Sequence, residues 1–324
     1  NWGLGHATRC IPIIKALVEY NFEPVLASDG AALELLNKEF PDLICLNLPP
    51  YNISYSKKGS HFKYKILKDA PKILKNIKAE RKATAEIISK YNIAGVISDN
   101  RFGVSNKNVP CVFMTHQIQV LSGSTTWFST KIHQKIIKKF DECWVPDNRV
   151  EPNLSGKLGH TDSLDISLKY IGPISRFQKR NIEIVYDLLV LLSGPEPQRS
   201  ILEEKLSNEL INFSGKVLFV KGIVESEMKK DERSHITYYN FLTSEQLENA
   251  INQSKLIISR SGYTTIMDLA KLGKKAFFIP TPGQFEQEYL AERLNINKIV
   301  PSCSQETFTL KALEDVKDFK GLKT

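Results

Sequence analysis

Residues 255–279 contain two short apolar runs separated by a helical pattern, and this arrangement limits the fold more than any other feature. The runs, 255–259 and 276–279, are each bounded by turn-forming residues, as buried parallel strands are. Between them, residues 264–272 place apolar side chains on one helical face, and the pattern stops at Gly273. A strand, a helix and a strand in this order predict an α/β protein with a parallel sheet.

The turn at Ser261 and Gly262, between the first strand and the helix, predicts an anion site. The N–H groups at a helix start have no partner inside the helix, and the positive helix end attracts phosphate. Arg260 beside the turn suits a charge-assisted bond, and the Asp268 carboxylate suits a sugar diol. Residues 281–288 add oxygen-bearing side chains that suit sugar hydroxyls. A sugar carrying phosphate is therefore the expected ligand.

The same alternation of strands and helices continues through the chain and predicts doubly wound parallel sheets. Helices are expected at 7–20, 31–40 and 66–91, and further strands at 23–27, 43–48, 93–99, 109–114, 141–146, 186–192, 217–220 and 235–239. The strand at 141–146 is expected to be the last of the first half. The sequence opens in what reads as a loop, so we expect the first strand of that half to precede it.

The N-terminal loop is the first candidate site of that half. Gly3 and Gly5 allow a ligand to approach the backbone closely, and the following helix start favours a phosphate or a developing negative charge. A third glycine is absent because position 8 is Thr, which disfavours a nicotinamide site. His6 is the candidate catalytic residue of this loop. Its alternative role is a helix cap bonded to the backbone.

Other polar residues follow the strands expected at 93–99 and 109–114. Asp99 and Arg101 come after the first of these strands, and His116 after the second. The carboxyl ends of parallel strands meet at one edge of a sheet, where ligands gather, so these residues share an edge with His6. Asp99 or His116 is a possible general base, and each could instead pair with Arg101.

A second glycine-containing turn follows the strand expected at 186–192. Ser193 and Gly194 form the turn, and Arg199 lies at the start of the next helix, where its guanidinium suits a diphosphate.

At both ends of the chain the sequence resembles a known family. S-R-S-G-Y-T-T-I-M-D followed by P-T-P-G-Q-F-E-Q-E-Y-L-A resembles the donor-binding half of glycosyltransferase family 28, and N-W-G-L-G-H-A-T-R resembles its N-terminal glycine loop. The family includes the enzyme that transfers N-acetylglucosamine from its UDP donor to the lipid-linked precursor of peptidoglycan. The resemblance implies two Rossmann-like domains of the GT-B type: an acceptor-binding domain at 1–174, a linker at 175–182 and a donor-binding domain at 183–324.

The resemblance also implies roles for individual residues. In the family, the segment matching Phe241 and Leu242 seats the uracil ring, and an acidic or histidine residue near the 93–116 region faces the acceptor. With the two turns, the expected donor-binding residues are Ser193, Gly194, Arg199, Phe241, Leu242, Arg260, Ser261, Gly262, Thr264, Asp268, Gln284, Glu286 and Gln287. The N-terminal loop G-L-G-H and the turn S-G-P-E-P-Q-R depart from the peptidoglycan enzyme, so a different acceptor is expected.

The positive charge of the chain is concentrated in its first half. Up to residue 173 there are 23 Lys and Arg against 16 Asp and Glu, whereas the formal net charge of the whole chain is +8. An anionic membrane surface or an anionic acceptor fits this asymmetry as well as nucleic acid does, and no nucleic-acid-binding motif is present. On the helix expected at 66–91, one face carries four lysines that either contact lipid headgroups or are simply solvated: Lys68, Lys72, Lys75 and Lys82.

The residue patterns also bear on cofactors and compartment. The sequence has no D-x-D pair and no Cys or His cluster with metal-ligand spacing, so no metal or cofactor is expected beyond a UDP-sugar as co-substrate. Backbone amides, helix ends and Arg199 or Arg260 are then expected to stabilise the leaving diphosphate. The scattered cysteines predict free thiols in a reducing compartment, which indicates the cytoplasm, with contact at the inner face of the cell membrane.

Taken with the resemblance, these residues predict a metal-independent inverting transferase. It moves a sugar, N-acetylglucosamine or a relative, from UDP to a membrane-associated or glycolipid acceptor, with His6 as the base. One alternative is a UDP-sugar 2-epimerase of the same fold, which would release free sugar without an acceptor. The other is a sugar-nucleotide-binding protein without catalysis.

Overall fold

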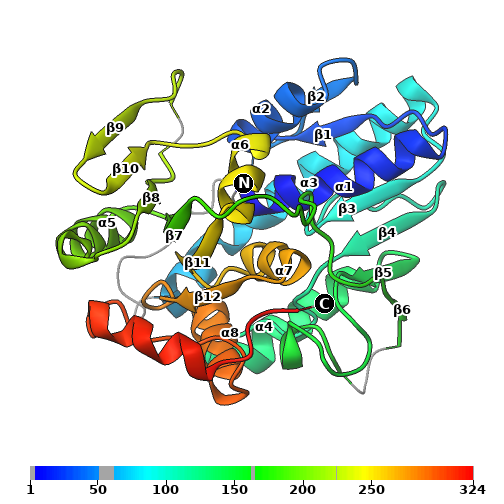
Figure 1. Ribbon diagram of the computed structural model, residues 1–324. Coiled ribbons are helices and arrows are strands. Elements are labelled where there is room, and N and C mark those ends of the chain that lie inside the picture. The colour runs from blue at the N-terminus through cyan, green and yellow to red at the C-terminus, as the bar shows by residue number, and fades with distance from the viewer. Residues whose placement is uncertain (1–3, 51–61, 162–164, 224, 324) are drawn as a thin grey trace. The chain divides into compact units, whose positions relative to one another are not determined.

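The computed structural model describes residues 4–50, 62–161, 165–223 and 225–323, with the side chains of residues 4 and 62–73 outside that description (Figure 1). The chain divides into two compact units, Asn1–Arg176 and Phe177–Thr324. The division falls inside the segment 175–182. The fold is α/β with parallel sheets, as the alternation predicts.

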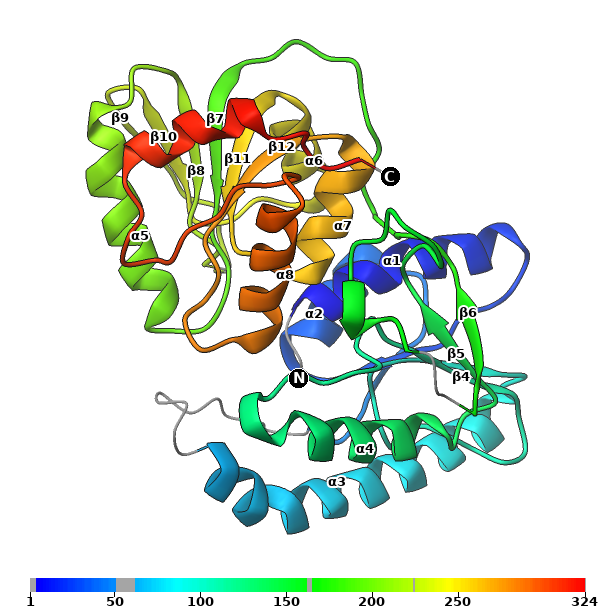
Figure 2. The ribbon, with the colours of Figure 1, turned by 90° about the horizontal axis from the view of Figure 1, so that it is seen from below.

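The described residues of the first unit form two sheets. Strands β1 (Leu26–Ser28) and β2 (Cys45–Asn47) pair in parallel, and the four-stranded sheet has the order β3-β4-β5-β6, also parallel. Its strands are β3 (Val96–Asp99), β4 (Cys111–Met114), β5 (Glu142–Val145) and β6 (Ser167–Tyr170). The helices are α1 (Leu4–Glu19), α2 (Gly30–Glu39), α3 (Phe62–Tyr91) and α4 (Thr126–Ile137). Side chains of α3 and α4 share a core cluster with β4 and β5, so both helices cover one face of that sheet (Figure 2).

Two features of the first unit differ from expectation. The strand at 141–146 is not the last, because β6 pairs with β5 beyond it. Ser167–Tyr170 alternates exposed and half-buried side chains at the sheet edge, so it lacks the apolar run of a central strand. Helix α4 was not expected either: its buried face contains His133 beside Ile137, which weakens the apolar pattern.

The second unit has one six-stranded sheet with the order β12-β11-β7-β8-β10-β9. All neighbours pair in parallel except β9 and β10. The strands are β7 (Tyr186–Leu191), β8 (Val217–Val220), β9 (Lys230–Arg233), β10 (Ile236–Tyr239), β11 (Ser254–Ser259) and β12 (Lys275–Phe278). The helices are α5 (Gln198–Glu209), α6 (Ser244–Asn252), α7 (Tyr263–Leu272) and α8 (Phe285–Ile296), with a 3-10 helix, η5, at Leu310–Asp318.

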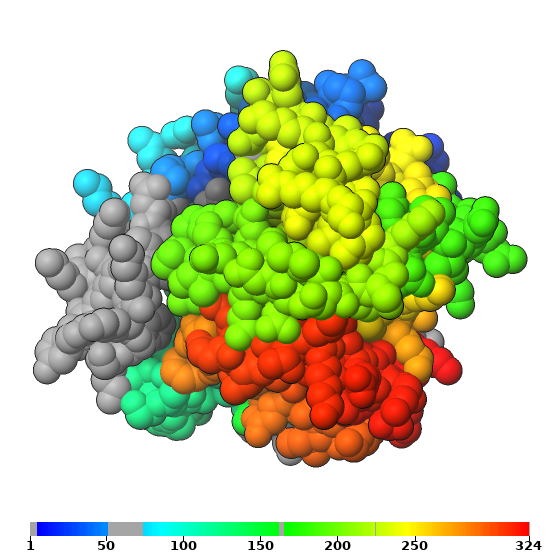
Figure 3. Space-filling view, turned by 60° about the vertical axis from the view of Figure 1, so that its left-hand side comes forward, coloured from blue at the N-terminus to red at the C-terminus, as the bar shows by residue number. Residues whose placement is uncertain are grey.

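Both faces of this sheet are buried, as a parallel sheet with helices on each side requires. Leu188, Val190 and Phe219 pack with α5 and η5 on one face, and the alternate residues Leu189 and Leu218 are also buried. Figure 3 shows α5 and η5 side by side on the surface, where the Leu310 N–H donates to Glu209 Oε2 at 2.8 Å. None of the helices in the described part of the chain is long and apolar enough to cross a membrane.

The segments not predicted in this unit are polar. All four residues of β9 are exposed, and a charged edge strand discourages pairing with another chain. Helix α8 mixes buried Leu290, Ala291 and Leu294 with polar residues, so its sequence lacks an apolar stripe.

Candidate functional site

In the first unit, His6, Arg9, Asp99 and His116 form one hydrogen-bonded cluster. His6 and Arg9 lie three residues apart on α1, which places them on the same helical face. Asp99 is the last residue of β3, and His116 follows the carboxyl end of β4, the neighbouring strand. The structure therefore brings together the three predicted catalytic candidates and adds Arg9, which we did not predict.

Arg9 and Asp99 form a buried ion pair. The Arg9 side chain is 1% exposed, and its Nε donates to Asp99 Oδ1 at 3.0 Å and to Oδ2 at 2.9 Å. Burial by itself would raise the pKa of Asp99, but the charge of Arg9, and then that of His6, holds this pKa well below its usual range. Asp99 stays ionised at neutral pH and is too weak a base to take a proton from a hydroxyl. It is better suited to orienting its neighbours.

The Nδ1 atom of His6 has two possible partners. It lies 3.2 Å from Asp99 Oδ2 and 2.9 Å from the Arg9 guanidinium. Arg9 always donates, so the tautomer decides the role of the ring. If Nδ1 carries the proton and donates to Asp99, Nε2 has the lone pair that a general base needs. If Nδ1 accepts from Arg9, Nε2 carries the proton and His6 is a donor.

His116 has a single role in this cluster. It is 5% exposed, and its Nδ1 lies 3.0 Å from Arg9 Nη1. Because the guanidinium has no lone pair to offer, Nδ1 must accept, and the neutral ring carries its proton on Nε2. His116 is thereby a hydrogen-bond donor, which leaves His6 as the base candidate.

Arg101 does not join this cluster through any contact that the structure shows. Its Nε donates to Glu80 Oε1 at 2.5 Å, and its Nη2 donates to the Pro49 carbonyl at 2.9 Å. Asp29 lies 3.3 Å from Nη1. These partners tie α3 to two loops, so the expectation that Arg101 contacts an acceptor or phosphate is replaced by a structural role.

Of the two glycines in the N-terminal loop, the structure describes one. Gly3 lies outside the described residues. Gly5 is half-buried at the start of α1, and its carbonyl accepts a bond from Thr8 Oγ1 at 3.0 Å. The bond closes the first helical turn.

The Arg9–Asp99 pair leads to a prediction about acid stability. Replacing Asp99 by Asn leaves Arg9 buried without a counter-charge, so Asp99→Asn should lower the free energy of unfolding at pH 7 by ~3–5 kcal/mol. The pKa of Asp99 is lowered by folding, so its contribution is complete above its usual value of 3.8 and is lost as the pH falls further. Urea unfolding of both proteins at pH 7, 4 and 3 should show the difference shrinking. A difference independent of pH would contradict the ion pair.

In the second unit, three loops leave the same edge of the sheet. Strands β7, β11 and β12 are neighbours, so their carboxyl ends place Ser193–Gly194, Arg260–Gly262 and the loop 280–284 together. Ser193 and Gly194 are exposed, with φ of +108° at Gly194. Ser261 Oγ donates to the Gln287 carbonyl at 2.8 Å, which joins the second loop to α8.

The Arg260 side chain connects neighbouring segments at this edge through hydrogen bonds. It is 1% exposed, and its guanidinium donates to the carbonyls of Gln198 at 2.8 Å, Ile279 at 3.1 Å and Pro280 at 2.9 Å. It also donates to Gln305 Oε1 at 2.6 Å. Burial lowers the pKa of Arg260 to about 10, so it remains charged at neutral pH. Both Nη groups are used inside the fold, whereas Nε is buried with no partner within the described residues. The contacts of Arg260 that the structure shows are therefore structural, and its contact with phosphate stays a prediction.

The Arg199 guanidinium is likewise bonded to groups inside the fold. Its Nε donates to Glu196 Oε1 at 2.6 Å and its Nη1 to Glu203 Oε2 at 2.6 Å. Burial would lower the pKa of Arg199, but the two glutamates raise it above its ordinary value. A guanidinium neutralised by two carboxylates has little charge left for a diphosphate, so the expectation that Arg199 contacts a diphosphate is corrected.

The start of α7 remains open to a ligand. Gly262 is its N-cap, and a Cβ added there would meet no atom within 4 Å. Thr281 Oγ1 is buried and has no hydrogen-bond partner within the described residues. It lies 3.7 Å from the position that a Cβ on Gly194 would take. An unpartnered hydroxyl between two glycine turns and beside a helix N-terminus indicates a site for a ligand oxygen.

The remaining predicted donor residues lie on α7 and α8, at the N-cap of α8 and before α6. Gln287 Oε1 accepts from the Thr281 N–H at 2.9 Å, and Gln287 Nε2 donates to Gln284 Oε1 at 2.6 Å, so both amides shape the loop. Asp268 is 8% exposed, whereas Thr264 and Glu286 are half-buried. The half-buried pair Phe241 and Leu242 precedes α6, and the Phe241 N–H donates to Asn240 Oδ1 at 3.0 Å.

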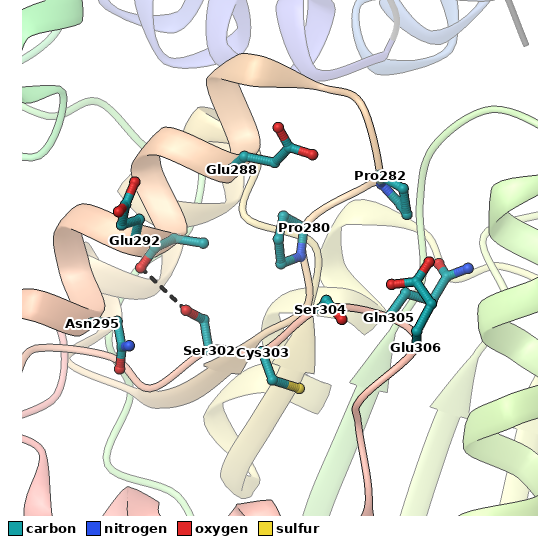
Figure 4. Close-up of a pocket in the computed structure, with 11 residues that line it drawn as sticks. Pro280, Pro282, Glu288, Glu292, Asn295, Ser302, Cys303, Ser304, Gln305 and Glu306 are labelled. Carbon is teal, nitrogen blue, oxygen red and sulfur yellow. Dashed lines mark hydrogen bonds between the residues drawn. The ribbon is translucent and has the colours of Figure 1, made fainter. Parts of the chain in front are cut away.

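A pocket of about 290 Å³ is lined by Pro280 and Pro282 together with residues of α8 and of the segment 302–306 (Figure 4). Carboxylates of Glu288, Glu292 and Glu306 surround it, which makes it unsuited to phosphate. The glycine turns at the edge of the sheet therefore suit a phosphate better than this pocket does.

Comparisons with known proteins relate part of the chain to a family and most of it to a curated relative. Residues 196–316 match the glycosyltransferase family 28 C-terminal domain. The chain is 26% identical over 291 residues to the UDP-N-acetylglucosamine–N-acetylmuramyl-(pentapeptide) pyrophosphoryl-undecaprenol N-acetylglucosamine transferase of Clostridium perfringens, covering 85% of this chain and 75% of that protein.

Solved structures give the fold. MurG of Acinetobacter baumannii matches with a TM-score of 0.56 and 13% identity, covering 98% of this chain and 87% of that one. The spinosyn rhamnosyltransferase SpnG complexed with thymidine diphosphate matches with a TM-score of 0.58 and 11% identity, with the same two coverages, 98% and 87%. These matches identify the fold as GT-B.

Proposed function

We propose that this glycosyltransferase, whose residues 196–316 match the glycosyltransferase family 28 C-terminal domain, transfers a sugar from UDP to a membrane-associated or glycolipid acceptor. N-acetylglucosamine or a close relative is the proposed sugar, since the relative in Clostridium perfringens is named for that donor. The observation that carries the proposal is the unpartnered Thr281 hydroxyl beside the open start of α7.

On this proposal the diphosphate binds at the edge of the second sheet. The N–H groups at the start of α7 and the Ser193–Gly194 turn face its oxygens, and the Thr281 hydroxyl donates to one of them. Arg199 and Arg260 hold the loops in place. Asp268 and Glu286 serve the sugar hydroxyls, and Phe241 and Leu242 the uracil ring.

The first unit supplies the proton transfer. His6 Nε2 removes the proton from the acceptor hydroxyl as its oxygen attacks the anomeric carbon, and the bond to UDP breaks with inversion. Asp99, fixed in its ionised form by Arg9, stabilises the imidazolium that results. Helix α7 and the backbone amides accept the charge that develops on the leaving diphosphate, and no step uses a metal ion.

Calorimetric titration tests the donor half of this proposal. The chain would be titrated with UDP, UDP-N-acetylglucosamine, UDP-glucose, dTDP and a dinucleotide. Preferential binding of a UDP-sugar supports the proposal, and no binding of any uridine nucleotide contradicts it. Free sugar released from UDP-N-acetylglucosamine without an acceptor would favour the 2-epimerase instead. Tight binding without turnover on any acceptor would favour a non-catalytic binding protein.

Thr281→Val provides a sharper test of the phosphate site. Loss of the hydroxyl should weaken UDP binding by ~1 kcal/mol, or about fivefold, because one hydrogen bond to the ligand is removed. The free energy of unfolding of the unliganded protein should stay equal or rise, because the hydroxyl that is lost is buried without a partner. Calorimetry and urea unfolding measure the two quantities.

Thr84→Val is the matched control. The Thr84 hydroxyl is equally buried but donates to the Glu80 carbonyl at 2.9 Å. Its loss should lower stability and leave UDP affinity unchanged. If the Thr281→Val protein is less stable without ligand and binds UDP normally, the hydroxyl has a structural partner. The proposed phosphate site at Thr281 would then be wrong.

A further inference from the structure

Residues 98–101 turn the chain at the end of β3, and within the described residues only the Asn100 side chain of this turn makes no hydrogen bond. Its neighbour Asp99 belongs to the hydrogen-bonded cluster, and Arg101 bonds Glu80. The Asn100 Oδ1 atom is buried without a partner. A buried amide oxygen without a hydrogen bond costs folding free energy and is rare in folded proteins, so this atom requires an explanation.

The backbone of Asn100 is held by hydrogen bonds at the carboxyl edge of the sheet. Its φ is 57°, in the left-handed region, and its N–H donates to the carbonyl of Met114, the last residue of β4, at 3.2 Å. Ser98 Oγ donates to the Arg101 carbonyl at 2.8 Å and accepts from the Arg101 N–H at 3.1 Å, which closes the turn around Asn100. Asn100 is thereby fixed between the ends of two strands from which members of the hydrogen-bonded cluster come.

The turn alone does not account for an asparagine at this position. A left-handed backbone favours glycine, and asparagine is tolerated there because its side chain can bond backbone groups nearby. Asn100 makes no such bond within the described residues, so glycine would form the same turn and leave no buried polar atom. The unpaired amide is therefore expected to bond a ligand.

The amide also selects the chemistry of that ligand. Rotation about its last bond exchanges the C=O and the NH₂, and a hydroxyl can bond either of them because it both donates and accepts. Asp99, the preceding residue, lies 3.2 Å from Nδ1 of His6, the proposed base for the attacking hydroxyl. A sugar ring carries hydroxyls on neighbouring carbons and can supply both groups. We propose that Asn100 binds a second hydroxyl of the acceptor, so the reacting end of the acceptor is a sugar.

An anionic group of the acceptor fits Asn100 less well. A phosphodiester only accepts hydrogen bonds, so it would leave the amide oxygen without a partner in either orientation. The lysines expected to attract an anionic partner belong to α3 and not to this turn. Lys82 lies 3.9 Å from Glu86, which offsets its charge, and the side chains of Lys68 and Lys72 lie outside the described residues.

The inference rests on the proposed function and narrows its acceptor. Asn100 is assigned as a specificity-determining residue that bonds a hydroxyl beside the one that attacks. It takes no part in the proton transfer at His6. Its loss should therefore change how well an acceptor is used and not how a donor binds.

Asn100→Gly tests the inference, because glycine adopts the left-handed turn and removes only the side chain. The acceptor probes are the octyl glycosides of N-acetylglucosamine, glucose, galactose and mannose, and the donor is the UDP-sugar that the wild type binds most tightly. For the glycoside that the wild type uses best, the variant should lower kcat/KM about tenfold, because the hydrogen bonds to one hydroxyl are lost. Donor affinity should be unchanged by calorimetry. The free energy of unfolding should stay equal or rise, and a fall would show that the amide has a structural partner.

Hydrolysis of the same donor separates this role from an effect on the base. Water has no second hydroxyl, so Asn100→Gly should hydrolyse the UDP-sugar at the wild-type rate. Damage to the cluster around His6 would lower hydrolysis and transfer alike. A deoxy glycoside that lacks the hydroxyl beside the attacking one completes a double-mutant cycle. The wild type should use it about tenfold less well than the parent glycoside, and the variant should use both equally.

Asn92→Gly is the matched control. Asn92 is exposed, has a left-handed φ of 50° and follows α3, before the amino end of β3. The substitution makes the same backbone change at the other end of the strand. Its kcat/KM for the glycoside should equal that of the wild type.

Three kinetic results would overturn the inference. One is an equal kcat/KM for the glycoside in Asn100→Gly and the wild type. Another is an equal loss of transfer and hydrolysis in the variant, which would show that Asn100 acts through the base. The third is no transfer to any of the four glycosides by a wild-type chain that binds the UDP-sugar, which would show that the acceptor is not a sugar. Failure of the wild type to bind any uridine nucleotide would instead contradict the proposed function.

Discussion

Replacing His6 by alanine is expected to lower the turnover of sugar transfer by about 10²- to 10⁴-fold, the usual contribution of a positioned general base. UDP-sugar affinity should stay close to that of the wild type, because His6 belongs to the first unit and the proposed donor site to the second. The prediction rests on the tautomer in which Nδ1 donates to Asp99, because that contact orients the ring and leaves Nε2 as the basic atom. Steady-state kinetics with an active acceptor, together with calorimetry, measures both quantities.

His116→Gln is the control for His6→Ala. His116 accepts from Arg9 and is a donor in our assignment, and a glutamine amide can also accept and donate. Its effect on turnover should therefore be much smaller than that of His6→Ala. A larger effect at His116 would indicate that His116 is the general base and His6 the hydrogen-bond donor. If His6→Ala lost turnover and UDP-sugar affinity equally, His6 would be a donor ligand.

Arg260→Met should lower the free energy of unfolding by about 3 kcal/mol or more, measured by urea unfolding of the full chain. The change leaves three carbonyl acceptors, from Gln198, Ile279 and Pro280, and also Gln305 Oε1 without their donor, in a place that is 1% exposed. UDP binding should also weaken, because the loops around Thr281 and Gly194 lose their common tie.

Arg260→Lys separates the structural role from direct phosphate contact. A lysine keeps the charge but has no planar fork, so it cannot bond several carbonyls in different directions. If Arg260 ties the loops, Arg260→Lys should be nearly as unstable as Arg260→Met. If Arg260 touched phosphate, the lysine variant should recover most of the UDP affinity while remaining unstable.

Much of the fold could be predicted from the sequence because its signals are local. The apolar run of β8 was placed at its observed bounds, and the stop of α7 at Gly273 is confirmed by a left-handed φ of 64° there. The start of α6 is fixed by a capping box, in which Thr243 and Gln246 bond each other's backbone. Each of these features depends on residues within one or two turns of each other.

The parts that were missed depend on position in the sheet. Strands β6 and β9 lie at sheet edges, where solvent on one side permits polar residues and removes the apolar run. Helix α8 buries only part of its surface, so its pattern is mixed. Neighbouring sequence carries no sign of where in a sheet a strand will lie.

The sequence determined that glycine turns, a helix start and a histidine would stand at the carboxyl edges of parallel strands. Only the tertiary structure decided what each charged group does there. An arginine beside a turn can bind a ligand or hold a loop, and the choice depends on the carbonyls and carboxylates within reach. Arg9 meets Asp99 across 90 residues of sequence, Arg260 meets Gln305 across 45, and both are thereby used inside the fold. Such partners come from distant segments, and a buried charge bonds whichever of them the packing brings close.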